Sequence, residues 1–151
     1  MAWLDLLAAR ELSQEEYYAA VPPASPTVVL SEADFAAAIH DAMRAYCRPE
    51  TLRQSPLLNS RLVMEQSGPA VDKSERVAVL LELIRNAAES LQASPRDAKF
   101  YRALHRTYFN PADSQELAAE ALNLPFSTYR RHLKTGVAMV TEMLWSKEIS
   151  M

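Results

Sequence analysis

Apolar residues recur every three or four positions along most of the chain, which is the spacing of one face of an α-helix. The clearest stripe begins after Asp72 and comprises Val77, Leu80, Leu81, Ile84, Ala88 and Leu91. A second stripe begins after Ser31 and comprises Phe35, Ile39, Ala42, Met43 and Tyr46. We expect this helix to stop near Arg48-Pro49, because the residue before a proline disfavours helical backbone. These patterns predict an all-α helical bundle.

The first part of the chain carries the same spacing over residues 1–20, where Ser13 and Glu16 form a capping-box pattern. Residues 21–26 contain three prolines and predict a linker, since proline cannot continue a helix. Residues 27–30 are β-branched or apolar, and we expect them to be extended but too isolated for a sheet.

Shorter helices are predicted from Ser94 onward. Ser94 as N-cap and Pro95 at the first helical position predict a helix over 95–108, which Asn110-Pro111 then breaks. Asp113 is expected to cap the next helix, Ser114–Leu122, with Glu116 as its reciprocal partner. The predicted buried side of that helix comprises Leu117, Ala118, Ala121 and Leu122.

Asn123-Leu124-Pro125 predicts a turn with an apolar plug, and Ser127 is the expected N-cap of the helix that follows. Four-residue spacing turns three side chains of that helix inward, namely Tyr129, Leu133 and Val137. The residues left facing outward are Thr128, Arg130, Arg131, Lys134 and Thr135. We expect this helix to end near residue 136 and a further helix, over 137–145, to support it or to form a dimer contact.

The outward face carries three positive charges and no acid at the front of its helix. A recognition helix offers this arrangement to DNA: arginine can bond guanine at two points in the major groove, while neighbouring basic groups hold phosphates. A pair of adjacent arginines on its own is more typical of a solvated surface. The DNA-binding hypothesis therefore depends on the cap, the turn, the small alanines and the basic face occurring in register.

The run SQELAAEALNLPFSTYRRHL, residues 114–133, resembles the region-4 helix-turn-helix of bacterial sigma factors and of related response-regulator output domains. The resemblance covers about 98–145. It implies a trihelical DNA-binding unit with these DNA-facing residues: Ser127, Thr128, Arg130, Arg131 and Lys134. Two departures stand out. Asn123 replaces the usual glycine, which asparagine tolerates because it also adopts left-handed backbone, and Phe126 adds an aromatic ring after the turn.

Composition narrows the functional classes. The chain has only two glycines, so neither a P-loop nor a dinucleotide-binding fingerprint can form. Its single cysteine permits no intramolecular disulfide and no multi-cysteine zinc site. The net charge is −3. However, the segment from Ser94 to the end holds eight basic and six acidic side chains. A phosphate group responds to this local surplus of positive charge and not to the net charge of the whole chain.

The sequence gives little support for catalysis or for metal binding. His40, His105 and His132 fall on three different predicted helices, without a pair of ligands at i, i+4. No nucleophile elbow occurs. We therefore predict no enzymatic activity, no metal and no cofactor.

No segment approaches the roughly 20 apolar residues of a transmembrane helix, and the start has no basic signal-peptide region. A soluble, cytoplasmic protein without membrane contact is expected.

The sequence thus predicts two domains, a helical domain of unknown role over 1–93 and a helix-turn-helix DNA-binding domain over 94–151. The predicted function is sequence-specific binding of double-stranded DNA in transcription regulation, through a recognition helix at about 127–136. Dimerisation is a further expectation, since two-fold operators are common. The alternative hypothesis is a helical protein-interaction module that binds RNA polymerase, or an ATPase or other regulator domain, without contacting DNA.

The middle of the chain leaves one more alternative open. Four arginines are spread through it, Arg44, Arg48, Arg53 and Arg61. Their default interpretation is a solvated surface or ion pairs with local acids, and a phosphate-binding role is the lesser alternative.

Overall fold

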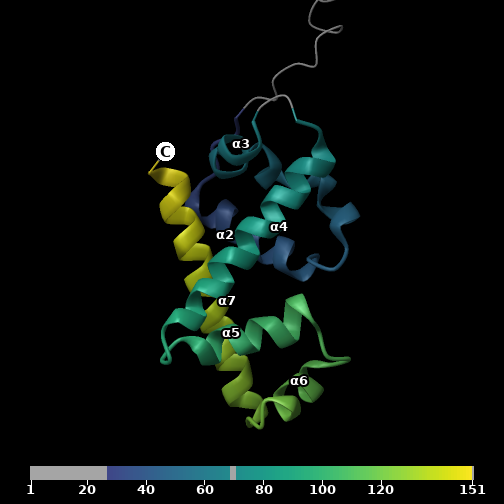
Figure 1. Ribbon diagram of the computed structural model, residues 1–151, viewed down its shortest axis with the longest axis vertical. Helices are drawn as coiled ribbons and strands as arrows, with labels where there is room; N and C mark the ends of the chain where they lie inside the picture. The colour runs from purple at the N-terminus through teal and green to yellow at the C-terminus, as the bar shows by residue number, and fades with distance from the viewer. Residues whose placement is uncertain (1–26, 69–70, 151) are drawn as a thin grey trace, which may run out of the picture.

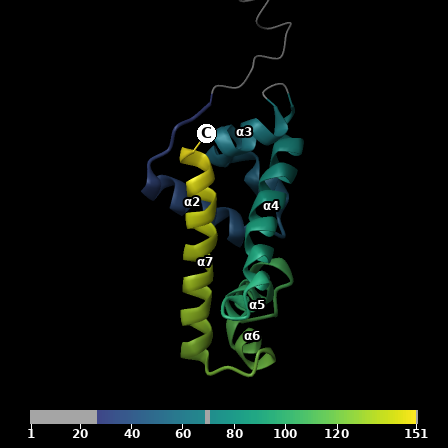
Figure 2. The ribbon, with the colours of Figure 1, turned by 60° about the vertical axis from the view of Figure 1, so that its left-hand side comes forward.

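The computed structural model describes residues 27–68 and 71–150, and over these residues the chain is helical without a β-strand. The predicted all-α class is confirmed. The helix expected at 1–20 and the linker expected at 21–26 lie outside the described residues. Helix α7 runs the length of the molecule, with α2, α3 and α4 around its C-terminal half and α5 and α6 around its N-terminal half (Figures 1 and 2).

Helix α2 (Glu32–Arg44) begins as predicted, because the Ser31 hydroxyl accepts a hydrogen bond from the Asp34 amide at 3.1 Å. It ends at Arg44, earlier than the predicted Arg48-Pro49. The amides of Tyr46 and Arg48 bond carbonyls three residues back, which tightens the chain into turns. Two 3₁₀ helices follow, η1 (Pro49–Gln54) and η2 (Pro56–Asn59).

Helices α3 (Arg61–Ser67) and α4 (Lys73–Ser90) lead into a short 3₁₀ helix, η3 (Leu91–Ala93). Asp72 caps α4 by accepting a hydrogen bond from the Glu75 amide at 2.9 Å. The predicted stripe of α4 faces the core: all its members are buried except Leu81, which is partly buried.

Helix α5 (Ala98–Leu104) continues into η4 (His105–Phe109), a π-helical segment. The predicted start of this helix at Ser94-Pro95 is wrong. The amides of Asp97 and Ala98 both bond the Ser94 carbonyl, so that 94–97 form a turn and Asp97 becomes the N-cap.

Helices α6 (Gln115–Ala121) and α7 (Phe126–Ile149) follow in the predicted order, but α7 is a single helix of 24 residues. The expected separation into helices at about 127–136 and 137–145 is therefore wrong. The helix passes through Gly136, which is buried against α5.

Gly136 allows α5 and α7 to approach closely. A Cβ atom placed on it would lie 3.0 Å from Leu104 Cγ and 3.1 Å from the Phe100 carbonyl oxygen. Both distances are shorter than ordinary van der Waals contact. The glycine thus lowers the helix propensity of α7 but permits the packing of Leu104, which is fully buried.

The other end of α7 is held by a buried carboxylate. Glu148 is only 5% exposed. Its two oxygens accept hydrogen bonds from the amides of Arg61 at 2.9 Å and Leu62 at 2.8 Å. These are the first amides of α3, which have no partner within their own helix. The bond pair ties the C-terminal end of α7 to α3.

The boundary predicted between 93 and 94 stays a prediction. The buried side chains form one continuous cluster that extends from Phe35 in α2 to Leu144 in α7. Residues on both sides of the boundary therefore share a core.

Replacing Gly136 by alanine should destabilise the protein by ~1–2 kcal/mol, because steric overlap with α5 outweighs the gain in helix propensity. Urea unfolding measures the change. The control is the opposite substitution at exposed Ala138, where alanine to glycine should cost about 1 kcal/mol through propensity alone. A more stable Gly136→Ala protein would contradict the packing argument.

Replacing Glu148 by glutamine should lower the free energy of unfolding by ~1–3 kcal/mol, because one amide of α3 loses a charged acceptor in a buried site. The same urea experiment applies. Glu142→Gln, on the exposed face of the same helix, should change stability by less than about 0.5 kcal/mol. Equal stabilities for the two variants would show that the carboxylate does not fix the end of α7.

Candidate nucleic-acid interface

The front of α7 is held in place by Tyr129, whose side chain is fully buried. Its hydroxyl forms a hydrogen bond with the Thr107 hydroxyl, which in turn donates to the Ala103 carbonyl at 2.7 Å. Leu133 is buried and Val137 is partly buried on the same side. The predicted inward set of this helix is therefore confirmed, and its rotation about its own axis is fixed.

The turn between α6 and α7 has the expected backbone at Asn123, with φ of 56° in the left-handed region. Leu124 is partly buried, and its amide donates to the Ala119 carbonyl at 3.0 Å. The prediction that Ser127 caps α7 is wrong. The helix begins at Phe126, because the Pro125 carbonyl already accepts the Tyr129 amide at 3.0 Å. Ser127 lies inside the first turn and is exposed.

Two predictions for α6 are also wrong. Ser114, in place of Asp113, caps the helix, because its backbone is extended and its hydroxyl accepts the Leu117 amide at 3.1 Å. The buried residues are Ala118 and Ala119. Leu117 is 46% exposed, so it does not wedge α6 against its neighbours. Of the other residues expected inside, Ala121 is exposed and Leu122 partly buried.

The predicted DNA-facing residues lie at the front of α7. Ser127, Arg130, Arg131 and Lys134 are exposed, and Thr128 is half-buried. Within residues 27–68 and 71–150, no salt bridge joins these three basic groups to an acid. The Arg130 guanidinium lies 5.8 Å from the centre of the Phe126 ring. The positive charge is thus accessible to solvent, and no acid of the described residues forms an ion pair with it.

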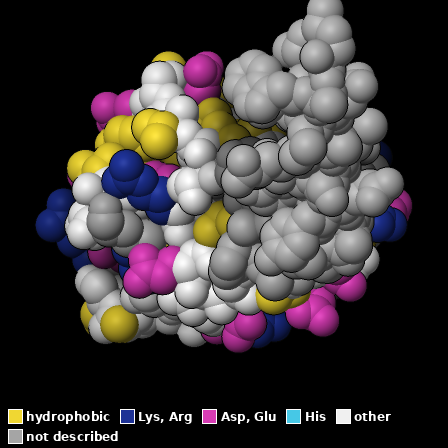
Figure 3. Space-filling model, turned by 90° about the horizontal axis from the view of Figure 1, so that it is seen from above, with side chains coloured by type: hydrophobic (Ala, Val, Ile, Leu, Met, Phe, Trp, Pro, Cys, Tyr) yellow, Lys and Arg dark blue, Asp and Glu magenta, His cyan; other side chains and the backbone are white. Residues whose placement is uncertain are grey.

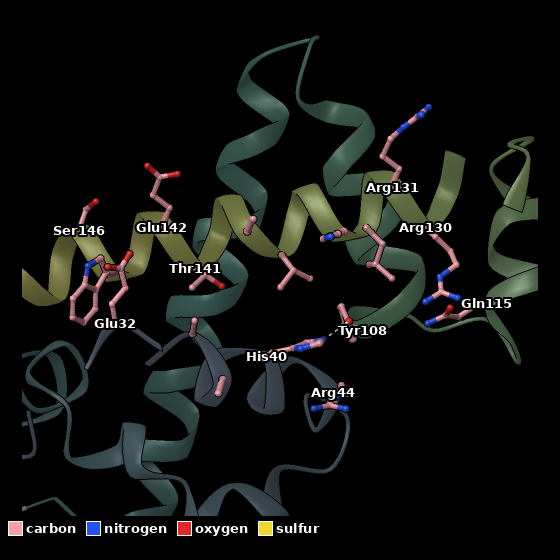
Figure 4. Close-up of a pocket in the computed structure, with 17 residues that line it drawn as sticks. Glu32, His40, Arg44, Tyr108, Gln115, Arg130, Arg131, Thr141, Glu142 and Ser146 are labelled. Carbon is pink, nitrogen blue, oxygen red and sulfur yellow. Dashed lines mark hydrogen bonds between the residues drawn. The ribbon is translucent and has the colours of Figure 1, made fainter. Parts of the chain in front are cut away.

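Two of the arginines project from different sides of α7. Arg130 points toward Gln115 at the start of α6, and Arg131 projects away from α2 (Figure 4). The basic face therefore spreads over more than one side of the helix.

A groove of about 1270 Å³ separates α2 from this face of α7. Five basic residues line it, namely His40, Arg44, Arg130, Arg131 and Lys134, and Arg44 and Arg130 lie at one end, the basic end (Figure 4). The lining also includes apolar residues, among them Leu133, Val137, Ala138 and Trp145, and two acids, Glu32 and Glu142. Figure 4 shows these two acids at the opposite end from Arg44 and Arg130. The charge of the groove is thus segregated along its length.

Tyr108 lies at the basic end of the groove, where its hydroxyl forms a long hydrogen bond of 3.5 Å with His40 Nε2 (Figure 4). Burial raises the pKa of Tyr108 above the ordinary value of a phenol, and this effect outweighs the opposing one of the Arg44 charge. The phenol therefore stays neutral at physiological pH and adds no negative charge beside the arginines.

A second basic group lies where α5 meets α7. Burial lowers the pKa of His132 from its ordinary value of 6.5, and the positive charges of Lys99, Arg131 and Arg102 lower it further. Phe100 separates these groups: its ring centre is 5.5 Å from that of His132 and 5.2 Å from the Lys99 ammonium. Lys99, Arg102 and Arg131 are all exposed around the neutral imidazole.

The opposite end of the molecule has a different surface. Seen from the α3 end, acidic and basic side chains are interspersed around the visible face (Figure 3). The described part of the chain holds no cluster of three or more His, Cys, Asp or Glu side chains placed to bind a metal. Nor has any helix in this part the length and apolar character to cross a bilayer.

Sequence reasoning did not place four of these residues at the interface, namely His40, Arg44, Lys99 and Arg102. Arg44 was recognised only as one of several scattered arginines. Lys99 and Arg102 contributed only to the positive charge of the C-terminal segment. Their positions in two other helices give no signal until those helices are packed on α7.

Because the pKa of His132 is lowered on folding, the unfolded chain takes up this proton at a higher pH than the folded protein. Stability should therefore fall as the pH drops below about 6.5, and His132→Gln should show a smaller loss. Urea unfolding midpoints of both proteins between pH 7.5 and 5 measure this. Parallel pH profiles would mean that His132 is not held neutral.

Comparison of the chain with protein-family models, with curated proteins and with solved structures finds no match.

Proposed function

We propose that the protein binds double-stranded DNA through the front of α7 and acts in transcription regulation. The observation that carries the proposal is the exposed, unpaired positive face formed by Arg130, Arg131 and Lys134 on a helix that Tyr129 anchors to the core. A helix that inserts in the major groove needs hydrogen-bond donors that face the bases, and it needs packing on its other side that fixes its position.

The elements around this face support the same role. The order α6, turn, α7 is that of a helix-turn-helix, and the resemblance of residues 114–133 to sigma-factor region 4 points to the same unit. From Ser127 to Lys134 the helix rises about 10 Å, which is sufficient to span several base pairs. Arginine side chains can bond guanine O6 and N7 together, and so select a sequence.

The groove favours a second candidate, a helical protein-interaction module. Its apolar lining, which includes Val137 and Trp145, suits the apolar face of a partner helix from RNA polymerase or from an ATPase domain. The salt dependence of binding separates the two candidates. Phosphate contacts give a steep fall in affinity with salt, whereas an apolar contact gives a shallow one.

Selection of bound duplexes from a random library, at stated salt, tests the proposal and supplies a target. Arg130→Ala and Arg131→Ala should then each weaken binding to that target by ~1–3 kcal/mol and relax the preference at one or two base positions. Fluorescence anisotropy measures the affinities. Lys147→Ala is the control: it removes an exposed positive charge from the other end of α7 and should leave the affinity within twofold.

Two results would refute DNA binding by this face. One is a library that yields no enriched sequence and no salt-dependent binding. The other is an Arg130→Ala/Arg131→Ala double variant with the affinity of the original protein.

A further inference from the structure

We infer that the DNA backbone is held on both sides of α7 by residues of other helices, Arg44 of α2 on one side and Lys99 and Arg102 of α5 on the other. The inference rests on the proposed function. It assigns phosphate contacts to three residues outside the helix that resembles a recognition helix, one of them in the segment before Ser94.

Arg44 is placed for this contact by the packing of α2 on α7. It is the last residue of α2, it lines the groove together with Arg130 and Lys134, and it lies at the same end of the groove as Arg130 (Figure 4). Its Nη2 atom lies 2.7 Å from Asp41 Oδ1, but both side chains are largely exposed, at 60% and 70%. An exposed pair of this kind contributes little to stability, so a phosphate can replace the carboxylate at small cost.

Lys99 and Arg102 hold the corresponding position on the α5 side. Both are exposed, and both lie close enough to His132 to lower its pKa together with Arg131. Phe100, which contacts Lys99, and the neutral imidazole of His132 on α7 add no negative charge there. Positive potential is therefore concentrated beside Arg131, whose side chain projects away from α2 (Figure 4).

The dimensions of a duplex fit this two-sided arrangement. An α-helix with its side chains is about 10–12 Å across, and the major groove is about 12 Å wide. When the front of α7 occupies the groove, residues flanking the helix face the two phosphate strands that form its walls. Arginine can then bond a phosphate at two points, and lysine attracts it as a point charge.

Two acidic residues limit how much of α7 the duplex is expected to cover. Glu32 and Glu142 lie at the opposite end of the groove from Arg44 and Arg130 (Figure 4). Phosphates placed there would be repelled, so the duplex is expected to cover α7 only as far as about Lys134. Both proposed flanks lie beside this covered part of the helix.

The test is the salt dependence of binding to a fluorescein-labelled 25-base-pair duplex of the selected sequence and to one of random sequence. Each phosphate contact contributes about 0.9 to the slope of log affinity against log salt concentration. Arg44→Ala should lower the slope by about 0.9, and Lys99→Ala/Arg102→Ala by about 1.8, on both duplexes. Arg53→Ala removes an exposed arginine outside the groove and should leave the slope unchanged.

The selected sequence should be the same for the flank variants as for the original protein, because phosphate contacts carry no base information. An unchanged slope in either flank variant would overturn the two-sided arrangement. If Arg130→Ala/Arg131→Ala still abolished sequence preference in that case, the proposed DNA binding would stand and only the two-sided arrangement would be refuted. If the original protein bound neither duplex, the proposed DNA binding and the two-sided arrangement would both be refuted.

Discussion

The close approach of α5 and α7 at Gly136 is the constraint on which the interface depends. With no Cβ at this position, the backbone of α7 lies against Leu104 and the Phe100 carbonyl. The same approach brings the π-helical segment that follows α5 beneath the front of α7, where Thr107 bonds the Tyr129 hydroxyl. The rotation of α7 follows from these contacts, and with it the direction in which its basic residues project.

Local signals in the sequence predicted much of the fold. The starts of α2 and α4, after Ser31 and Asp72, were predictable because a capping side chain acts within three residues of the helix start. The inward set of Tyr129, Leu133 and Val137 followed from periodicity, and the left-handed Asn123 followed from turn chemistry. The exposure of Arg130, Arg131 and Lys134 was therefore predictable too, as the reverse side of the same pattern.

The errors arose where tertiary packing decides between local alternatives. Gly136 weakens a helix by about 1 kcal/mol relative to alanine, so that a break near it was a reasonable prediction. The contact with α5 compensates for this cost, and α7 continues. Ser114 and Asp113 are both good caps, so the local sequence does not choose between them, and the exposure of Leu117 depends on how α6 packs against its neighbours. The groove could not be predicted, because it depends on α2 packing against a helix about 90 residues later.

The continuity of α7 also bears on how an acidic chain could attract the proposed nucleic-acid partner. The chain carries a net charge of −3, yet α7 carries Arg130, Arg131 and Lys134 near its start, and its two acids, Glu142 and Glu148, lie toward its other end. Glu148 is bonded to the amides of α3 and does not face the solvent, and Glu142 lies at the far end of the groove. In the proposed complex, a phosphate backbone near the front of α7 would meet the local positive charge at a distance of a few ångströms. The acids at the other end of a helix about 36 Å long are separated from it by more than a Debye length at physiological salt, so they scarcely weaken the attraction.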